Sequence, residues 1–250
     1  MPRARPCPSL CFVTPERYPC FVMRSRLSLL VLLALLAPLS RAQSGFALHF
    51  FPFQCRTVGV PLAAPTGAFT LEAWVNYQGD PQVYGSYPFM AFGDDAPFFG
   101  IVGEHVRVMS RSGVIVEAAG LVPGAWRHVA YTFDGTTSRL YVGGVEAGTS
   151  TTAPPTTGAD LGIGCHIGDT VFPGYLDEVI VWSEARTAAQ IAADREGLSA
   201  EAIASPALLA YFKFDEGTGQ VAGNAKPGGP DGTLGSSLDA DPRDPAWVLV

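Results

Sequence analysis

The segment from Gly124 to Gly148, GAWRHVAYTFDGTTSRLYVGGVEAG, constrains the fold more than any other part of the chain. Apolar and polar residues alternate on both sides of the turn sequences DGTTS and GG, and a period of two predicts β-strands with one buried face. Paired glycines readily adopt the positive φ angles that a tight hairpin turn requires. The segment therefore predicts three antiparallel strands in succession.

Two residues of this segment, Asp134 and His128, are candidates for chemistry. Asp134 precedes Gly135, and a carboxylate in such a turn bonds the backbone two residues further on, so we interpret it as a turn residue in preference to a metal ligand. His128 alternates onto the face opposite Val129, and the sequence shows no carboxylate partner for it. We therefore interpret His128 as a structural histidine.

Short apolar segments fill most of the remaining sequence, and the whole chain contains 28 glycines, 21 prolines and 16% charged residues. This composition is typical of turn-rich β proteins. Residues 69–77 predict a strand whose odd-numbered residues face the core, and residues 175–182 predict a strand with odd and even positions on opposite faces. Thr187 and Gln190 have the spacing of a capping box, which predicts one short helix.

The N-terminal 42 residues are set apart from the fold. Residues 23–42 have the three parts of a secretory signal peptide: two arginines, a leucine-rich apolar run, and a small-residue cleavage site ending at Ala42. Residues 1–22 contain several prolines and no periodicity, and we interpret them as a translation-start artefact upstream of Met23. No segment has the roughly 20 apolar residues of a transmembrane helix. We therefore expect a secreted protein, extracellular or periplasmic, without a membrane span.

The charge of the remaining chain narrows the choice of partners. Residues 1–42 contain six arginines and one glutamate, which leaves ten basic and 22 acidic side chains in residues 43–250. A strongly acidic chain is repelled by phosphate groups, so we expect neither nucleic acid nor anionic lipid as a partner.

Two cysteines, Cys55 and Cys165, follow residue 42. Two cysteines in an exported chain most simply form one disulfide. The alternatives are two free thiols or half of a metal site, although a lone pair of cysteines supplies too few ligands for zinc.

Four segments together resemble the laminin G-like, concanavalin A-like jelly-roll domains: FTLEAWV, GAWRHVAYTFDGTTSRLYVGGVEAG, LGIG and FPGYLDEVIVWSEARTAAQI. They occur in the order that the family pattern has, and the resemblance covers residues 46–194. The resemblance implies an all-β fold, a two-sheet antiparallel jelly-roll sandwich with one short helix. We assign the domain to residues 43–196 and a C-terminal extension, with an added strand and a glycine-rich tail, to residues 197–250.

The resemblance also bears on metal binding, because some members of the family bind calcium at a rim of the sandwich. The residues that match such ligands here are Asp177, Asp94 and Asp95. The first strand reads HFFPFQC, where relatives often have further acidic residues that a calcium ion favours. We therefore expect no cofactor, and structural calcium is the one metal that the resemblance leaves open.

Catalysis is disfavoured by the arrangement of carboxylates. Glycoside hydrolysis needs two of them about 5 to 10 Å apart. In the glucanases of this fold they lie on one face of a strand as Glu-x-Asp-x-x-Glu, whereas Asp177 and Glu178 are adjacent and predicted to point to opposite faces. The sequence also lacks a Gly-x-Ser-x-Gly motif, a His-Glu-x-x-His motif and a P-loop. We expect no enzyme activity.

Aromatic residues in loops are the candidate ligand contacts, because rings stack on sugars and on apolar side chains. Tyr84 and Tyr87 lie in a loop rich in glycine and proline, and Phe172 lies in a second loop; the alternative is that they pack beneath their own loops. We expect an exported, non-catalytic module that recognises carbohydrate or an extracellular protein through its rim loops. The alternatives are a structural or adhesion module without a small ligand and, least favoured, a glycoside hydrolase.

Overall fold

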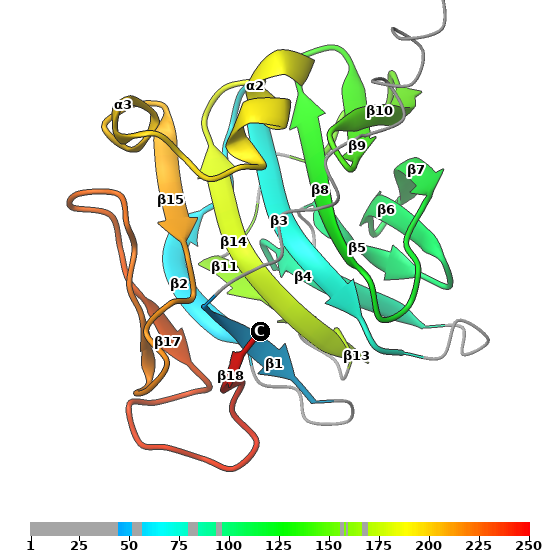
Figure 1. Cartoon of the computed structure of the whole chain (residues 1–250). Coiled ribbons are helices and arrows are strands. Elements are labelled where there is room, and N and C mark those ends of the chain that lie inside the picture. Colours follow the sequence, from blue (N-terminus) through cyan, green and yellow to red (C-terminus); the bar gives the residue numbers. More distant parts are fainter. Residues whose placement is uncertain are drawn as a thin grey trace, which may run out of the picture. The chain divides into compact units, whose positions relative to one another are not determined.

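The computed structural model describes residues 45–51, 57–79, 85–93, 97–155, 158, 160–166 and 170–250, all within a compact unit formed by residues 40–250. Two antiparallel sheets of eight strands each dominate these described residues, one behind the other in Figure 1. The predicted all-β sandwich is confirmed.

The front sheet, which we call sheet A, has the order β10 (Val145–Ser150), β9 (Ser138–Val142), β8 (Trp126–Phe133), β3 (Phe69–Tyr77), β14 (Gly174–Trp182), β1 (Phe46–Phe50) and β18 (Ala246–Leu249), with β15 (Leu208–Phe212) also paired to β14. The rear sheet, sheet B, has the order β16 (Val221–Ala222), β17 (Gly232–Leu234), β2 (Val58–Ala63), β11 (Asp160–Ile163), β4 (Ser86–Ala91), β5 (Phe98–Val102), β6 (His105–Ser110) and β7 (Gly113–Ala119). A two-stranded ribbon pairs β12 (Cys165–His166) with β13 (Thr170–Val171).

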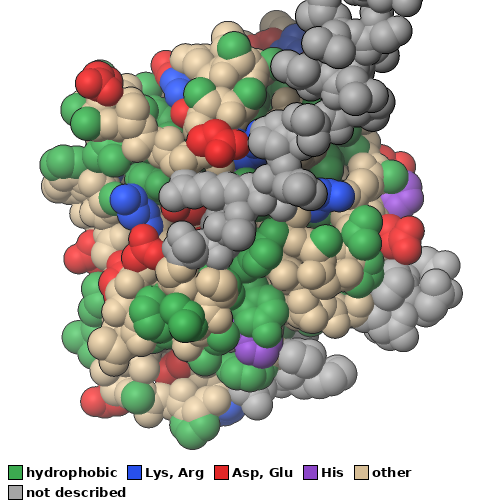
Figure 2. Space-filling view, viewed as in Figure 1, with side chains coloured by type: hydrophobic (Ala, Val, Ile, Leu, Met, Phe, Trp, Pro, Cys, Tyr) green, Lys and Arg blue, Asp and Glu red, His purple; other side chains and the backbone are tan. Residues whose placement is uncertain are grey.

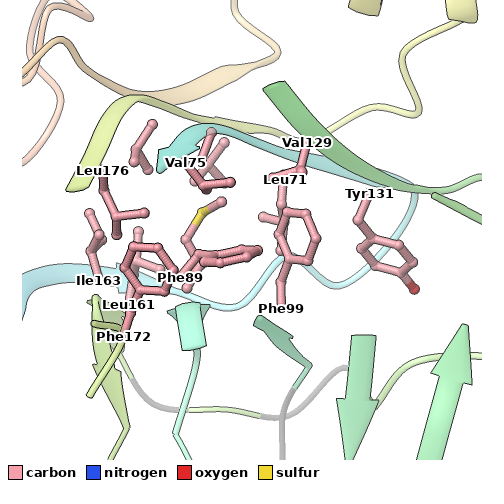
Figure 3. Packing of buried hydrophobic residues seen from close by; sticks show 14 of the residues in the cluster. Leu71, Val75, Phe89, Phe99, Val129, Tyr131, Leu161, Ile163, Phe172 and Leu176 are labelled. Atoms are coloured by element: carbon pink, nitrogen blue, oxygen red, sulfur yellow. The ribbon is translucent and has the colours of Figure 1, made fainter. Parts of the chain in front are cut away.

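The core lies between the two sheets and is built from residues of both (Figure 3). Its labelled members are Leu71, Val75, Phe89, Phe99, Val129, Tyr131, Leu161, Ile163, Phe172 and Leu176. Phe89 makes edge-to-face contacts with Phe99, at 5.3 Å between ring centroids, and with Phe172, at 5.1 Å. Such contacts between aromatic rings add to the free energy gained by burying apolar surface.

The segment from Gly124 to Gly148 forms β8, β9 and β10 as predicted. Gly143 and Gly144, with φ angles of 63° and 81°, form the tight turn between β9 and β10. Asp134 Oδ1 accepts hydrogen bonds from the backbone N–H groups of Thr136 and Thr137, and Oδ2 accepts one from Arg139 at 2.6 Å. These bonds hold the pKa of Asp134 well below its usual value. The interpretation of Asp134 as a turn residue is confirmed.

Strand β3 follows the predicted alternation on one face only. Its odd-numbered residues all belong to the core, as expected. The even-numbered residues, from Thr70 to Asn76, are also buried, so the prediction of a single buried face is wrong. The physical reason is that later parts of the chain cover this outer face: Trp74 Nε1 donates to the carbonyl of Arg195 at 3.1 Å, and Thr70 Oγ1 donates to the carbonyl of Glu184 at 2.8 Å.

Strand β14 departs from the predicted alternation because it contains a β-bulge between Asp177 and Ile180. Glu178, inside the bulge, has a φ angle of 49°, which non-glycine residues rarely adopt. The extra residue shifts the phase of the strand, so Leu176 and Val179 both face the core. The expectation that the even-numbered residues from 176 to 182 share one face is therefore wrong.

Two helices occur in the described chain, one more than predicted. The first, α2 (Ala188–Asp194), begins at Thr187 with the predicted capping box to Gln190. The second, α3 (Ala200–Ile203), is a single turn capped by Ser199. Both lie beside the outer face of sheet A (Figure 1), and neither described helix is long and apolar enough to cross a membrane.

The C-terminal segment is more deeply integrated than one added strand. β15 pairs with β14 and β18 pairs with β1 in sheet A, while β17 pairs with β2 in sheet B. The last 43 residues from Leu208 onward therefore complete both sheets of the sandwich.

Candidate ligand-binding face

The predicted ligand-contact residues are not gathered in one exposed patch. Phe172 is fully buried in the core, so its prediction as an exposed contact is wrong. Its backbone N–H donates to the carbonyl of Gly164, which folds the segment over the core and packs the ring beneath it. Tyr87, on β4, is half-buried against the core, with its ring centroid 6.2 Å from that of Tyr77. Tyr84 lies outside the described residues.

The predicted metal ligands are likewise not assembled in the described structure. Asp177 is 5% exposed, and its Oδ1 accepts the backbone N–H of Glu178 within the bulge. Asp94 and Asp95 lie outside the described residues. Within the described part of the chain, no three His, Cys, Asp or Glu side chains are arranged to hold a metal ion. The expectation of no cofactor, with structural calcium as the one metal left open, stays a prediction.

The predicted disulfide also involves a residue that is not described. Cys165 lies on β12 and is 1% exposed, and Cys55 is outside the described residues. The pairing of these two cysteines stays a prediction.

A row of aromatic residues crosses the outer face of sheet A at one end of its strands. Consecutive cross-strand pairs join His49 on β1 to Tyr175 on β14, Tyr175 to Asn76 on β3, and Asn76 to Trp126 on β8. The ring centroids of His49 and Tyr175 are 4.5 Å apart, and those of Tyr175 and Trp126 are 6.3 Å apart. Phe51 continues the row, with its ring centroid 4.3 Å from that of His49.

We call the four side chains of Phe51, His49, Tyr175 and Trp126 the aromatic strip. All four are partly exposed, and Figure 2 shows hydrophobic side chains and a histidine together over this end of sheet A. Burial lowers the pKa of His49 below its usual value of 6.5, so the imidazole is neutral at pH 7. The strip therefore offers an uncharged apolar surface.

Two amide side chains stand beside the aromatic strip. Gln78 Nε2 donates to Asn76 Oδ1 at 2.6 Å, which orients both groups. Among the described residues this bond leaves Asn76 Nδ2 as a donor and Gln78 Oε1 as an acceptor. Apolar rings with a few oriented polar groups are the usual composition of a ligand-binding surface.

The opposite end of the same face is closed by charged and polar side chains. Arg186 binds Asp194 through two hydrogen bonds, of 2.9 and 3.0 Å, and its guanidinium lies 4.1 Å from the ring centroid of Trp182. Beneath them, His128 Nε2 is 3.3 Å from Glu72 Oε2, close enough for an electrostatic contact although the geometry is not that of a hydrogen bond. We call these five residues the covered network.

Burial controls the protonation of the covered network. Glu72 and His128 are 0% and 1% exposed, and neither side chain has a hydrogen bond in the described structure. Desolvation, reinforced by the negative charge of Asp194, raises the pKa of Glu72 well above its usual value. Desolvation and the positive charge of Arg195 lower the pKa of His128 to about 3. Burial therefore favours the uncharged form of both side chains, and it closes the network to a ligand.

Sequence reasoning missed both ends of this face. His128 has a carboxylate neighbour, Glu72, which the sequence did not show. The two residues are 56 positions apart and meet because β3 pairs with β8. The sequence did contain a signal for the aromatic strip. Aromatic residues stand at outward-facing positions near the ends of predicted strands, in the sequences LHFF, GYL and AWR.

Two antiparallel sheets packed face to face, with a short helix on one outer face, define a concanavalin A-like sandwich. A model of the concanavalin A-like lectin/glucanases superfamily, of the laminin G type, matches residues 56–192. The match covers more than half of the chain, and the protein belongs to this superfamily. No curated protein sequence matches the chain significantly.

Solved structures with the same fold include a Bacteroides ovatus protein described as carbohydrate-binding, with a TM-score of 0.62 and 23% identity. That alignment covers 82% of this chain, and this chain spans 62% of the length of that protein. A SAP-like pentraxin from Limulus polyphemus has a TM-score of 0.47 and 16% identity over 61% of this chain and 82% of its own. Domain 4 of an extracellular GH43 arabinanase from Geobacillus stearothermophilus, in complex with arabinotriose, has a TM-score of 0.46 and 19% identity over 55% of this chain and 70% of its own.

Proposed function

We propose that this protein is an exported, non-catalytic module that binds carbohydrate on the aromatic strip. The observation that carries the proposal is the row of partly exposed rings of His49, Tyr175 and Trp126, with oriented amides beside it. The C–H groups of a sugar pack on aromatic surface, and its hydroxyl groups pair with amides. The description of the Bacteroides ovatus protein as carbohydrate-binding agrees with this proposal.

The absence of catalysis is part of the proposal and rests on where four carboxylates of β3, β14 and α2 lie. Glu72 and Asp194 belong to the covered network and are closed to a substrate. Asp177 accepts a backbone N–H in the bulge, and Glu178 accepts a hydrogen bond from the Tyr211 hydroxyl. Neither pair flanks an open cleft in which a glycosidic bond would be cut.

Glycan-array binding tests the proposed function directly. The protein is expressed with its own N-terminal segment, purified, and compared with Trp126→Ala. Loss of the indole is expected to weaken binding to the best glycan about tenfold, which corresponds to about 1.4 kcal/mol. Val145→Ala is the matched control, because Val145 is an apolar side chain that is 70% exposed on β10, away from the strip. A blank array, or equal binding by Trp126→Ala, would contradict the proposal, and self-association of the protein would then favour an assembly module.

Export and oxidation are tested on the same preparation. We propose that cleavage after Ala42 makes Gln43 the first residue of the secreted chain, and N-terminal sequencing checks this. A mature protein that still begins at Met1 would contradict it. We also propose a disulfide between Cys55 and Cys165, which predicts one cross-linked peptide pair in a non-reducing digest and two separate peptides after reduction.

A further inference from the structure

A second feature of the outer side of sheet A is a surface pocket of about 400 Å³ beside β15. Its lining residues are Lys213, Asp215, Glu216, Gly223, Asn224 and Ala225. We call it the β15 pocket. Its volume lies within the range of small-ligand sites in proteins. Figure 2 shows basic and acidic side chains next to each other over the lower end of β15.

The pocket forms where two strands share one edge of β14. β15 pairs with β14 along residues 179–182, and β1 pairs with it along residues 174–176. The bulge at Asp177 and Glu178 separates these two stretches. The chain that leaves β15 must therefore turn away from β14, and residues 213–216 make this turn beside the start of β1.

The turn sends its charged side chains outward because its apolar residue is anchored in the core. Phe214 has a φ angle of 55° and is fully buried, with its ring stacked on Phe212 at 6.1 Å between centroids. Its neighbours Lys213 and Asp215 are exposed. A positive φ in a bulky residue is unfavourable, and such strain in a folded chain is most often found at functional sites.

Hydrogen bonds fix the walls of the pocket, and both polar atoms of the Asn224 side chain take part in them. Its Oδ1 accepts from the backbone N–H groups of Tyr211 and Lys226, and its Nδ2 donates to the carbonyl of Pro230. Glu216 Oε1 accepts the backbone N–H of Gly223 at 2.7 Å, which fixes one carboxylate at the rim. The pocket is therefore preformed, and Asn224 is a part of its frame.

The groups that face a ligand are one ammonium and two carboxylates. The Lys213 ammonium lies 5.7 Å from the ring centroid of Tyr211. Asp215 rests against the start of β1, where a Cβ on Gly45 would lie 2.6 Å from Asp215 Oδ1. Together these groups offer both donors and acceptors, with a net negative charge in a chain whose formal charge is −7. A ligand anion would be repelled, whereas hydroxyl groups, which both donate and accept, satisfy ammonium and carboxylate together.

The pocket and the aromatic strip lie at the two ends of β1. Gly45 adjoins the pocket and His49 belongs to the strip, so four residues, about 13 Å at about 3.3 Å per residue, separate them. An oligosaccharide of a few units covers such a distance.

We propose that the β15 pocket holds one uncharged sugar unit of the glycan that lies on the aromatic strip, with Lys213, Asp215 and Glu216 bonding its hydroxyl groups. This inference rests on the proposed function and adds two statements to it. The ligand is a neutral oligosaccharide, and it must be long enough to reach from the strip to the pocket.

Calorimetric titration of the full protein with neutral oligosaccharides of two to six units, of the type that binds best on the array, tests the inference. Affinity is expected to rise with length and then level off when the ligand reaches the pocket. The double variant Asp215→Asn, Glu216→Gln is expected to lose about tenfold in affinity for the long ligands and nothing for the disaccharide, because hydrogen bonds to charged groups are lost in the pocket alone. Trp126→Ala is expected to weaken binding at every length.

The outcomes separate the two proposals. Glu104→Gln, an exposed carboxylate on the β5–β6 turn, is the control and is expected to bind like the wild type. Wild-type binding of long ligands by the pocket variant would overturn the inference and leave the proposed function standing. Preferential binding of a uronic-acid oligosaccharide of equal length would also overturn it. Failure of every sugar to bind would overturn both proposals.

A melting experiment with calcium chloride tests whether the β15 pocket binds a cation instead of a sugar. If calcium raises the melting temperature of the wild type and leaves that of Asp215→Asn, Glu216→Gln unchanged, the pocket holds a cation and the inference is wrong. Equal melting temperatures with calcium and with chelator are the expected result.

Discussion

The two ends of the outer face of sheet A use the same three strands for opposite purposes. At one end β3, β8 and β14 carry Glu72, His128 and Trp182 of the covered network, which the ion pair of Arg186 with Asp194 completes. At the other end the same strands carry Tyr175 and Trp126 of the aromatic strip, with Asn76 between them, and the two rings remain partly exposed. Charged side chains are usually exposed and aromatic rings are usually buried, so this face shows the reverse of the usual distribution.

The difference teaches that the side chains which a strand can place on its outer face depend on whether another part of the chain covers that face. The loop before α2 supplies Arg186, and the guanidinium compensates Asp194 where neither could be buried alone. No described helix reaches the aromatic strip (Figure 1), so rings there stay accessible to an external ligand. Four experiments test this contrast.

The largest effect is expected for Arg186→Ala, because it leaves Asp194, which is 5% exposed, without its cationic partner. Breaking one partner out of a buried ion pair costs about 3 to 5 kcal/mol of unfolding free energy. Urea denaturation measures this loss. The control Arg243→Ala removes a guanidinium that is 59% exposed from its pair with Asp241 and is expected to lower the free energy of unfolding far less than Arg186→Ala does. Equal losses would mean that the network is not closed from water.

The next effect is expected for Ile191→Ala, which removes the apolar anchor of α2. Ile191 is fully buried against Ala130 and Tyr141, and truncation of such a side chain costs about 2 to 4 kcal/mol. The same denaturation assay applies. Val145→Ala, at a side chain that is 70% exposed, is expected to stay within about 0.5 kcal/mol of the wild type.

A smaller, pH-dependent effect is expected from Glu72 and His128. The folded pKa of Glu72 is raised, so the native state holds a proton that the unfolded state releases, and Glu72 lowers stability increasingly as pH rises above about 4.5. The folded pKa of His128 is lowered from 6.5 to about 3, so its contribution to stability is complete above pH 6.5 and is lost as pH falls toward 3.

Denaturation of two variants across pH 3 to 9 separates these terms. Glu72→Gln is expected to gain stability relative to the wild type as pH rises, and His128→Gln is expected to gain relative stability as pH falls below 6.5. Parallel curves for wild type and variants would show that neither group titrates differently in the folded and unfolded states.

The smallest effect on stability is expected for Tyr175→Ala in the aromatic strip. Its ring is partly exposed, and loss of its contacts with His49 and Trp126 is expected to cost about 1 kcal/mol. Binding to the array glycan is expected to fall at least tenfold in the same variant. A loss of stability as large as that of Ile191→Ala would place Tyr175 among the structural residues and not among the ligand contacts.

Local patterns predicted the elements whose cause is local. The two glycines after Val142 predicted a tight turn, and Thr187 with Gln190 predicted the start of α2. The odd-numbered residues of β3 predicted its core face. In each case the deciding contact is between residues a few positions apart, or depends on burial of a single apolar face.

Local sequence patterns could not predict the bulge in β14 or the sites that depend on it. The residues of LDEV are compatible with regular alternation, and the extra residue arises where β14 must serve β15 and β1 along one edge. Phe172 was predicted at the rim because its neighbours are loop residues, yet its ring fills the core beside Phe89. Loop composition does not show which side of a loop faces the protein.

By itself, the amino-acid sequence determined the all-β class, the laminin G-like family and the strands, because period-two alternation and turn residues act over short distances. The tertiary structure alone decided which strand faces are covered and which residues meet. His49, Tyr175 and Trp126 are separated by up to 126 positions, and strand pairing brings their rings together. The pKa of Glu72 is raised and that of His128 is lowered for the same reason, since desolvation depends on which parts of the folded chain cover a side chain.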